Sequence, residues 1–464
     1  MAKPSTLGEL KRSGYQPRTV RQELRANLLT KLRRGEPLFD GIVGFDDTVV
    51  PAIENAILAG HDVIFLGERG QAKSRMMRGV VELLDDEVPA MAGCEISDDP
   101  FAPICAACRS TLAELGDETP ITWIGREHRY AEKLATPDIS VADLIGEVDP
   151  IKVAEGRYLA DELTIHYGLI PRTNRGVFAI NELPDLAERI QVALLNLLEE
   201  RDVQIRGYKI RLPLDMMLLA SANPEDYTNR GRIITPLKDR FGAQVRTHYP
   251  RTLAEEVAIV HQEATPLEAD VPLRFPAWMS DIVAELTHQA RRSPQVNQRS
   301  GVSVRLSICN QETVAASAVK RSVRLAEAEA VPRISDLEAC ASSTLGKIEV
   351  EALEEGREED ILHKLVRQAV FAVFQKRLKG EAFTDLVRRF EEEGLEVEAS
   401  PVMGAEEFCR QFGELKGVTN ALEKLEAGES PATTAAALEF ICEGLHLGKR
   451  LNKTPTAEGA RYGR

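Results

Sequence analysis

The fold of this chain is decided by eight consecutive residues, Gly67-Glu68-Arg69-Gly70-Gln71-Ala72-Lys73-Ser74. The apolar stretch 61–66 before them predicts a short buried strand, and the segment 73–84 after them predicts a helix. A glycine-rich turn in this context points its backbone N–H groups inward, and the helix N-terminus adds the positive end of its dipole. The stretch 67–74 is therefore predicted to be a phosphate-binding P-loop.

The polar residues of this P-loop have expected roles. Lys73 is expected to neutralise the β- and γ-phosphates of ATP, and the Ser74 hydroxyl is expected to bind Mg²⁺. Ala72 occupies the position where a glycine is expected before the lysine. A methyl group is tolerated there if the local backbone has a negative φ. The alternative, a glycine turn without a ligand, is disfavoured by the motifs downstream.

Two later apolar strands end in polar residues that fit the same site. The stretch 176–182 reads Gly-Val-Phe-Ala-Ile-Asn-Glu, which is typical of a Walker B strand, with a plain core strand as the alternative. Glu182 is the expected general base, and Asn181 stands where the metal-linked aspartate is usual. Because an amide carries no charge, Asn181 leaves the strength of Mg²⁺ binding and the hydrolysis rate open. Asn223 is expected to reach the γ-phosphate and the attacking water.

Two arginines are candidates for nucleotide contacts from outside the loop. Arg240 follows Lys238 and Asp239, and we expect it to project into the nucleotide site of a neighbouring subunit. A local surface pair with Asp239 is the alternative. Arg305 opens a helix after the α/β region and is expected to contact the nucleotide from there, although arginines are common on helices.

The alternation of strand and helix signals predicts an α/β fold. Short apolar strands between helices imply a parallel sheet that is covered on both faces. An alternating pattern around Gly207 predicts a β-hairpin at 203–212. After Pro250 the periodicity becomes helical. The predicted sheet strands lie at 61–66, 121–125, 175–181, 216–223 and 244–249.

Composition narrows the function classes. The 464 residues are 43% hydrophobic and 28% charged, which fits a soluble globular protein. A net charge of −15 argues against nucleic acid as the main partner, and an aromatic content of 5% argues against base stacking. No apolar run approaches the ~20 residues that span a membrane, and the N-terminus lacks an apolar signal core. We therefore expect a cytoplasmic protein.

Three of the seven cysteines form a pattern typical of metal ligands. Cys94 is followed by Cys105 and Cys108, and His128 lies 20 residues further along the chain. Four such ligands make a closed tetrahedral zinc site, which would staple a loop of low hydrophobic content. Free thiols or a redox pair are the alternatives.

The order of these motifs resembles the AAA+ ATPases of the magnesium-chelatase I-subunit and MoxR group. The resemblance extends beyond the Walker motifs to 146–150 (Gly-Glu-Val-Asp-Pro), 181–186 (Asn-Glu-Leu-Pro-Asp-Leu) and 237–242 (Leu-Lys-Asp-Arg-Phe-Gly). It covers residues 41–345, about two thirds of the chain.

The resemblance implies an AAA+ nucleotide-binding domain at 41–250 and a helical lid at 251–345. Residues 1–40, a basic helical segment, and 346–464, a helical C-terminal extension, lie outside it. The basic segment is either a solvated helix face or a docking arm for an acidic neighbour. In the family, the hairpin at 203–212 and an insert around 146–170 would face the central pore of a ring.

The function implied by the resemblance is that of an ATP-hydrolysing ring motor, expected to be a hexamer. Relatives work with a partner that carries a von Willebrand factor A domain, and this chain has no Asp-x-Ser-x-Ser segment, so that partner would be a separate protein. The client is either a subunit of a tetrapyrrole metal chelatase or, as in MoxR proteins, a complex to be matured. Asn181, the cysteine loop and the C-terminal helices favour the second.

Two functions from other classes compete with the motor. Activators of alternative sigma factors share AAA+ signatures, but they carry a Gly-Ala-Phe-Thr-Gly-Ala loop, which is absent from the corresponding region 146–156. A non-hydrolysing scaffold is suggested by Asn181. Glu182, Asn223 and Arg240 argue against a scaffold, because binding alone does not need them.

Overall fold

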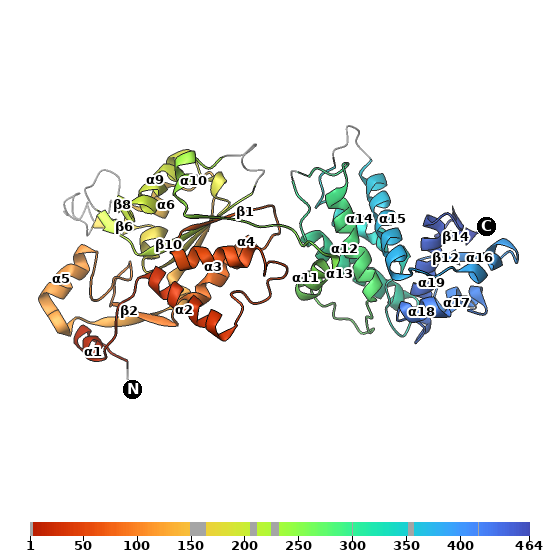
Figure 1. Cartoon of the computed structure of the whole chain (residues 1–464), viewed down its shortest axis with the longest axis horizontal. Coiled ribbons are helices and arrows are strands. Elements are labelled where there is room, and N and C mark those ends of the chain that lie inside the picture. Colours follow the sequence, from red (N-terminus) through yellow and green to blue (C-terminus); the bar gives the residue numbers. More distant parts are fainter. Residues whose placement is uncertain are drawn as a thin grey trace. The chain divides into compact units, whose positions relative to one another are not determined.

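The computed structural model describes residues 3–148, 164–204, 211–223, 232–298, 300–350, 357–415 and 417–464. The chain divides into two compact units, Met1–His248 and Tyr249–Arg464. Figure 1 colours the first from red to yellow-green and the second from green to blue. The finer division into four parts stays a prediction. Among the described residues, no helix combines the length and the apolar character that crossing a membrane requires.

The first unit is built on a five-stranded parallel sheet. Its strands follow the spatial order β11-β1-β10-β7-β4, and each neighbouring pair is parallel. The carboxyl ends of all five strands therefore lie at one edge of the sheet. The strands are β1 (Val63–Leu66), β4 (Tyr130–Leu134), β7 (Gly176–Asn181), β10 (Met216–Ala222) and β11 (Ala243–Arg246).

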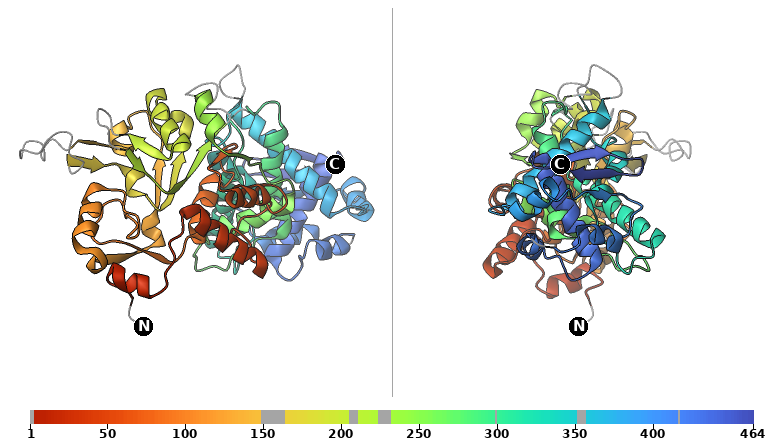
Figure 2. Two further views of the ribbon diagram at one scale, coloured as in Figure 1. Left: turned by 60° about the vertical axis from the view of Figure 1, so that its left-hand side comes forward. Right: turned by 90° about the vertical axis from the view of Figure 1, so that its right-hand side faces the viewer.

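Helices cover both faces of this sheet, because successive side chains of a strand point to opposite sides. Val63 and Phe65 of β1 pack in one layer with α2, α3 and α4. Ile64 and Leu66 pack in the other layer with α9 and α10. Figure 2 (left) shows the strands between these helices. The described helices of the unit are α1 (Leu7–Arg12), α2 (Val20–Arg34), α3 (Val49–Ala59), α4 (Lys73–Gly79), α5 (Ala106–Leu115), α6 (Val141–Leu144), α8 (Leu169–Arg172), α9 (Glu188–Glu199) and α10 (Thr235–Arg240).

The basic N-terminal segment contributes to the core of the first unit. One side of α2 is buried through Val20, Leu24 and Leu28. On the same helix, the buried carboxylate of Glu23 accepts two hydrogen bonds of 2.7 Å from the guanidinium of Arg129. An ion pair enclosed in this way fixes the helix to the segment before β4.

The prediction that residues 121–125 form a strand of the parallel sheet is wrong. Ile121–Gly125 is β3, which pairs antiparallel with β2 (Glu87–Met91) in a separate two-stranded sheet. The place beside β7 is taken by β4, which includes Glu132 and Lys133. β4 pairs with only one strand of its sheet, and such edge strands commonly carry charged side chains.

Two short antiparallel pairs extend from the α/β core. β8 (Asp202–Gln204) pairs with β9 (Arg211–Pro213), which confirms the predicted hairpin, and the tip at 205–210 lies outside the described residues. β5 (Gly146–Val148) pairs with β6 (Ile165–Tyr167). Most of the insert expected around 146–170 also lies outside the described residues.

The second unit is mainly helical and shares one hydrophobic core, which runs from Trp278 to Tyr462. A three-stranded antiparallel sheet of β12 (Val397–Ala399), β14 (Ala460–Gly463) and β13 (Asn452–Pro455) lies among the helices. The helical periodicity of the sequence did not indicate this sheet. The described helices are α11 (Leu253–Glu263), α12 (Ala277–Arg292), α13 (Arg305–Arg324), α14 (Cys340–Thr344), α15 (Glu358–Arg377), α16 (Thr384–Glu391), α17 (Ala405–Phe412), α18 (Thr419–Lys424) and α19 (Pro431–Leu447).

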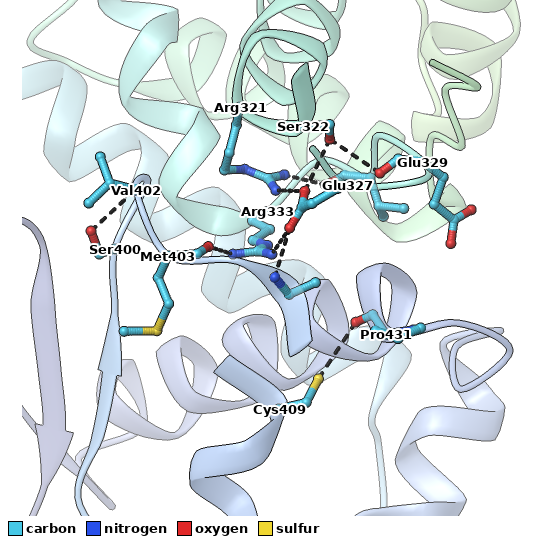
Figure 3. Close-up of polar contacts among 12 residues, drawn as sticks. Arg321, Ser322, Glu327, Glu329, Arg333, Ser400, Val402, Met403, Cys409 and Pro431 are labelled. Atoms are coloured by element: carbon cyan, nitrogen blue, oxygen red, sulfur yellow. Dashed lines mark hydrogen bonds and ion pairs between the residues drawn. The ribbon is translucent and has the colours of Figure 1, made fainter. Parts of the chain in front are cut away.

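A buried ion-pair cluster links α13 to the start of α17 (Figure 3). The carboxylate of Glu327 lies 2.8 Å from the guanidinium of Arg321 and 3.0 Å from that of Arg333. It also accepts a hydrogen bond of 2.7 Å from the backbone N–H of Ala405. Arg333 in turn donates to the carbonyl of Met403 at 2.9 Å. The cluster thus joins segments that lie about 80 residues apart in the sequence.

Candidate nucleotide site

The P-loop begins where β1 ends and stops where α4 begins. Gly67 has no room for a side chain, because an added Cβ would lie 1.9 Å from the Thr247 hydroxyl oxygen and 2.3 Å from the side-chain oxygen of Gln71. Gly70 has a φ of 73°, in the left-handed region that favours glycine. These two glycines give the turn its shape.

The backbone at Ala72 does not meet the condition under which a methyl group is readily tolerated at this position. Ala72 has a φ of 54° and a ψ of 15°, so this alanine is left-handed at the N-cap of α4. The Cβ of an L-residue crowds the carbonyl oxygen in this conformation, which costs about 1–2 kcal/mol. Glu182 is also left-handed, with a φ of 56°. Backbone strain of this kind commonly collects at functional sites.

Lys73 is buried at the centre of the loop. Its ammonium donates hydrogen bonds to the carbonyl oxygens of Gly67 (2.5 Å) and Glu68 (2.7 Å). It also donates to the side-chain oxygen of Asn223 at 2.8 Å. Asn223 lies directly after β10, the strand next to β1, so the parallel sheet brings together two residues that lie 150 positions apart.

A second group of polar side chains lies beside the first. The side-chain oxygen of Asn181 accepts hydrogen bonds of 3.0 Å from the hydroxyls of Ser74 and Ser221. The Ser221 hydroxyl oxygen accepts from the backbone N–H of Glu182, also at 3.0 Å. The hydroxyl of Ser74 and the amide oxygen of Asn181 are hard oxygen ligands of the kind that Mg²⁺ prefers.

Glu132 is a carboxylate of this group that the sequence analysis missed. It accepts a hydrogen bond from the side-chain amide of Asn181 and two from Arg78, at 2.6 and 3.0 Å. Burial opposes the ionisation of Glu132, but the hydrogen bonds from Arg78, Tyr130 and Asn181 outweigh it and lower the pKa. A negative charge therefore stands one strand away from the uncharged Asn181. No sequence signal marks Glu132, because it lies in the strand that was not predicted.

A cavity of about 410 Å³ is lined in part by the P-loop. Gly67, Glu68 and Gln71 line it from the loop, and Lys238 and Arg246 contribute cationic side chains. Positive charge beside a loop of this kind suits a polyanionic ligand.

The two predicted arginines lie in different units. Arg240 is the last residue of α10, and its guanidinium donates hydrogen bonds of 2.8 and 2.6 Å to the carboxylate of Glu199. Its local ion-pair partner is therefore Glu199 and not Asp239. Arg305 is the exposed first residue of α13 in the second unit, whereas the P-loop belongs to the first.

The three predicted cysteine ligands come together, but His128 does not join them. The sulfur atoms of Cys94, Cys105 and Cys108 lie with a carboxylate oxygen of Asp98 within 4.8 Å of one another. The side chain of His128 is 74% exposed and bonds to Glu127 at 2.9 Å. The expectation that His128 is the fourth ligand is wrong, because η3 (Arg126–Arg129) carries it into solvent. Asp98 takes its place in the cluster.

The fold and the site define a P-loop ATPase of the AAA+ class. No protein-family model matches the chain. Over 266 residues it is 28% identical to the magnesium-chelatase 38 kDa subunit of Rhodobacter capsulatus, covering 56% of this chain and 70% of that protein. Over 205 residues it is 30% identical to the subunit of the same name from Acidiphilium rubrum, covering 43% and 55%. The comparisons thus agree with the resemblance: over about half of its length the chain is similar to magnesium-chelatase subunits.

A third relative is magnesium-chelatase subunit ChlI of a Nostoc species, 28% identical over 49% of this chain and 58% of its own length. The chain thus spans between about half and 70% of the lengths of these relatives. Among solved structures, a complex of the magnesium-chelatase subunits BchI and BchD aligns with 68% of this chain and 96% of the other, at 21% identity and a TM-score of 0.36. NtrX from Brucella abortus aligns with 81% and 71%, at 14% identity and a TM-score of 0.39.

Proposed function

We propose that the chain is an ATP-hydrolysing ring motor that does work on a separate protein. The observation that carries this proposal is the convergence of Lys73, Asn223, Ser74 and Asn181 at the carboxyl edge of the sheet. Hydrogen bonds of 2.8 to 3.0 Å join these residues in two pairs. A nucleotide on the P-loop would have its terminal phosphates at this edge.

Each polar residue has a proposed role in hydrolysis. Lys73 binds the β- and γ-phosphates, together with the backbone N–H groups of the loop. Glu182 orients the attacking water as general base, and Asn223 holds the γ-phosphate and that water. Asn223 already contacts the Lys73 ammonium at 2.8 Å, so the two can exchange this contact for phosphate oxygens.

The oxygen ligands fit the Mg²⁺ that accompanies ATP. Ser74 would bind the ion directly, and Asn181 would accept from a water on it. Asn181 lacks the negative charge of the usual aspartate, but the carboxylate of Glu132 lies next to it. The side-chain nitrogen of Asn181 donates a hydrogen bond to this carboxylate. This arrangement leaves the Asn181 oxygen turned toward Ser74. Mg²⁺ offsets phosphate charge during transfer.

Two substitutions test the site. Lys73→Ala should weaken ATP binding roughly 100-fold, because it removes a charge-assisted contact of about 1.5–3 kcal/mol. Glu182→Gln should bind ATP normally but hydrolyse it about 10²–10⁴-fold more slowly. Binding is measured with a fluorescent ATP analogue and turnover by phosphate release. Lys320→Ala, an exposed lysine of α13, is the control and should change neither. Unchanged turnover in both test variants would refute the assignment.

The proposals of a ring and of a partner protein are based on the family resemblance. We propose a homo-oligomer, a hexamer, that acts in the cytoplasm with a separate protein carrying a von Willebrand factor A domain. The names of the relatives favour a tetrapyrrole metal chelatase as the complex that is driven. MoxR-like maturation of another complex is the second candidate, favoured by residues 346–464, which lie outside the motifs that carry the resemblance. Pigment or cobalamin genes beside this gene would support the chelatase. A neighbouring gene for a von Willebrand-domain protein, without pigment or cobalamin genes, would support MoxR-like maturation.

A further inference from the structure

Three thiols and one carboxylate meet in the connection between β2 and α5, which are labelled in Figure 1. Residues 92–105 of this connection form turns and coil without a helix or strand. Cys94 lies near the end of β2, and Asp98 follows four residues later. Cys105 is the N-cap of α5, and Cys108 lies in its first turn. The four side chains thus tie both ends of an irregular segment to one point.

The carboxylate of Asp98 is fully buried and only half satisfied. One oxygen accepts hydrogen bonds from the backbone N–H groups of Ile104 (3.1 Å) and Cys105 (2.9 Å). The other, Oδ1, is buried without a hydrogen-bond partner. Leaving a buried acceptor unsatisfied costs about 1–3 kcal/mol, and a bound ion is one of the ordinary explanations. This oxygen belongs to the same side chain that the three sulfurs surround.

The sulfur atoms are held by the backbone in a way that favours thiolates. The Cys94 sulfur accepts from the N–H of Asp98 at 3.4 Å. The Cys105 sulfur accepts from the N–H of Cys108 at 3.3 Å, at the N-terminus of the ten-residue helix α5. A thiolate at a helix N-terminus is stabilised by the exposed N–H groups and the helix dipole. Metals bind the thiolate and not the thiol.

We infer that Cys94, Asp98, Cys105 and Cys108 bind a single zinc ion. Three sulfurs select a soft or borderline metal over Mg²⁺ or Ca²⁺, and four ligands suit the tetrahedral geometry of zinc. Cys105 and Cys108 are each 6% exposed, Asp98 is fully buried and Cys94 is partly buried. Because the chain supplies all four ligands, we assign the site a structural role. Zinc satisfies the orphaned Asp98 oxygen and holds the 92–105 connection against α5. The site is separate from the proposed Mg²⁺ ligands Ser74 and Asn181.

The first test is the metal content of the full chain, purified with a thiol reductant and without chelator. Elemental analysis by inductively coupled plasma mass spectrometry should find about one zinc ion per chain. Zinc should be lost from Cys105→Ser but retained by Cys409→Ser, which removes a partly buried thiol of the second unit. A reduced chain that contains no zinc and takes up none, or a double variant Cys105→Ser, Cys108→Ser that keeps its zinc, overturns the inference.

The second test does not depend on the folding of a variant. Replacing zinc by Co²⁺ in the wild-type chain should give the intense visible absorption of a tetrahedral thiolate site. Asp98→Asn keeps an oxygen but removes the charge, so it should weaken zinc binding about 10–100-fold and shift the cobalt spectrum. An unchanged affinity and spectrum would remove Asp98 from the ligand set. A weak absorption spectrum typical of octahedral Co²⁺ would exclude the site. A disulfide between Cys105 and Cys108 that persists in the presence of the thiol reductant would also exclude it.

Discussion

Ala72 holds the tightest part of the P-loop in a conformation that its side chain disfavours. Its φ of 54° precedes the lysine that contacts the loop carbonyls and Asn223. Glu182, the proposed base, has a similar φ of 56°. Such strain costs of order 1–3 kcal/mol at each residue and persists only where the surroundings enforce it. Both residues lie beside the proposed phosphate site, although other described residues such as Ser97 and Phe383 also have a positive φ.

Replacing this alanine with glycine should relieve the strain. We expect Ala72→Gly to raise the free energy of unfolding by about 0.5–1 kcal/mol, since the lost strain exceeds the added freedom of the unfolded chain. Chemical denaturation of the nucleotide-free chain measures this. Ala56→Gly, in the interior of α3, is the control and should lower stability. A destabilised Ala72→Gly variant would mean that the loop is not strained at this residue.

The sequence predicted some contacts of the site and not others. Lys73, Asn181 and Asn223 could be placed together, because residues after parallel strands meet at one edge of a sheet. Glu132 and Asp98 could not, because neither follows a recognisable motif. Their positions depend on which segments pack side by side. The positive φ of Ala72 could not be predicted either, because the loop enforces a conformation that an isolated alanine would avoid.

Among the secondary-structure elements, the buried strands could be predicted from the sequence, whereas the edge strand β4 could not. β1, β7 and β10 are buried along their lengths, so their apolar runs were recognisable. β4 reads Tyr-Ala-Glu-Lys-Leu and is only partly buried, and its charged residues obscured it. Residues 121–125 carry a stronger apolar pattern but pair with β2. Strand pairing is a tertiary property, which a local pattern does not determine.

We expect the buried ion-pair cluster around Glu327 to stabilise the second unit. Glu327→Gln would remove the ion-pair partner that lies 3.0 Å from Arg333 and would leave Arg321 paired with Asp336 at 3.1 Å, although each arginine side chain is at most 3% exposed. Removing one member of a buried ion pair costs about 3–5 kcal/mol. We expect a loss of that size in the free energy of unfolding. Glu391→Gln, on the exposed side of α16, should change it by less than about 0.5 kcal/mol.

Unfolding of the second unit can be followed separately. The chain has two tryptophans, and Trp278 lies buried in the second unit, stacked on Phe440 at 4.5 Å. In a Trp123→Phe background, tryptophan fluorescence therefore reports this unit alone. Equal denaturation midpoints for the two glutamate variants would show that the cluster contributes no stability beyond its packing.

At the scale of the whole molecule, the proposed ring requires Arg240 to contact a nucleotide in a neighbouring subunit. Within its own chain it is bonded to Glu199, and its side chain is 29% exposed. A surface pair of this kind is worth about 0–1 kcal/mol, so leaving it costs little. We therefore expect Arg240 to exchange Glu199 for the γ-phosphate of a neighbouring subunit when the ring assembles. An arginine in that position is worth about 10³–10⁵ in rate.

Mixing two inactive variants tests the shared site most directly. Arg240→Ala keeps its own Lys73 and Glu182, and Glu182→Gln can supply an intact Arg240 to its neighbour. In a ring mixed at equal amounts, about one quarter of the interfaces pair an intact base with an intact arginine. Phosphate release should recover to a corresponding fraction of wild-type turnover. The control replaces the donor with the double variant Glu182→Gln, Arg240→Ala, which should restore nothing. If demonstrably co-assembled rings of the two single variants remain inactive, Arg240 does not act between subunits and the ring mechanism is contradicted.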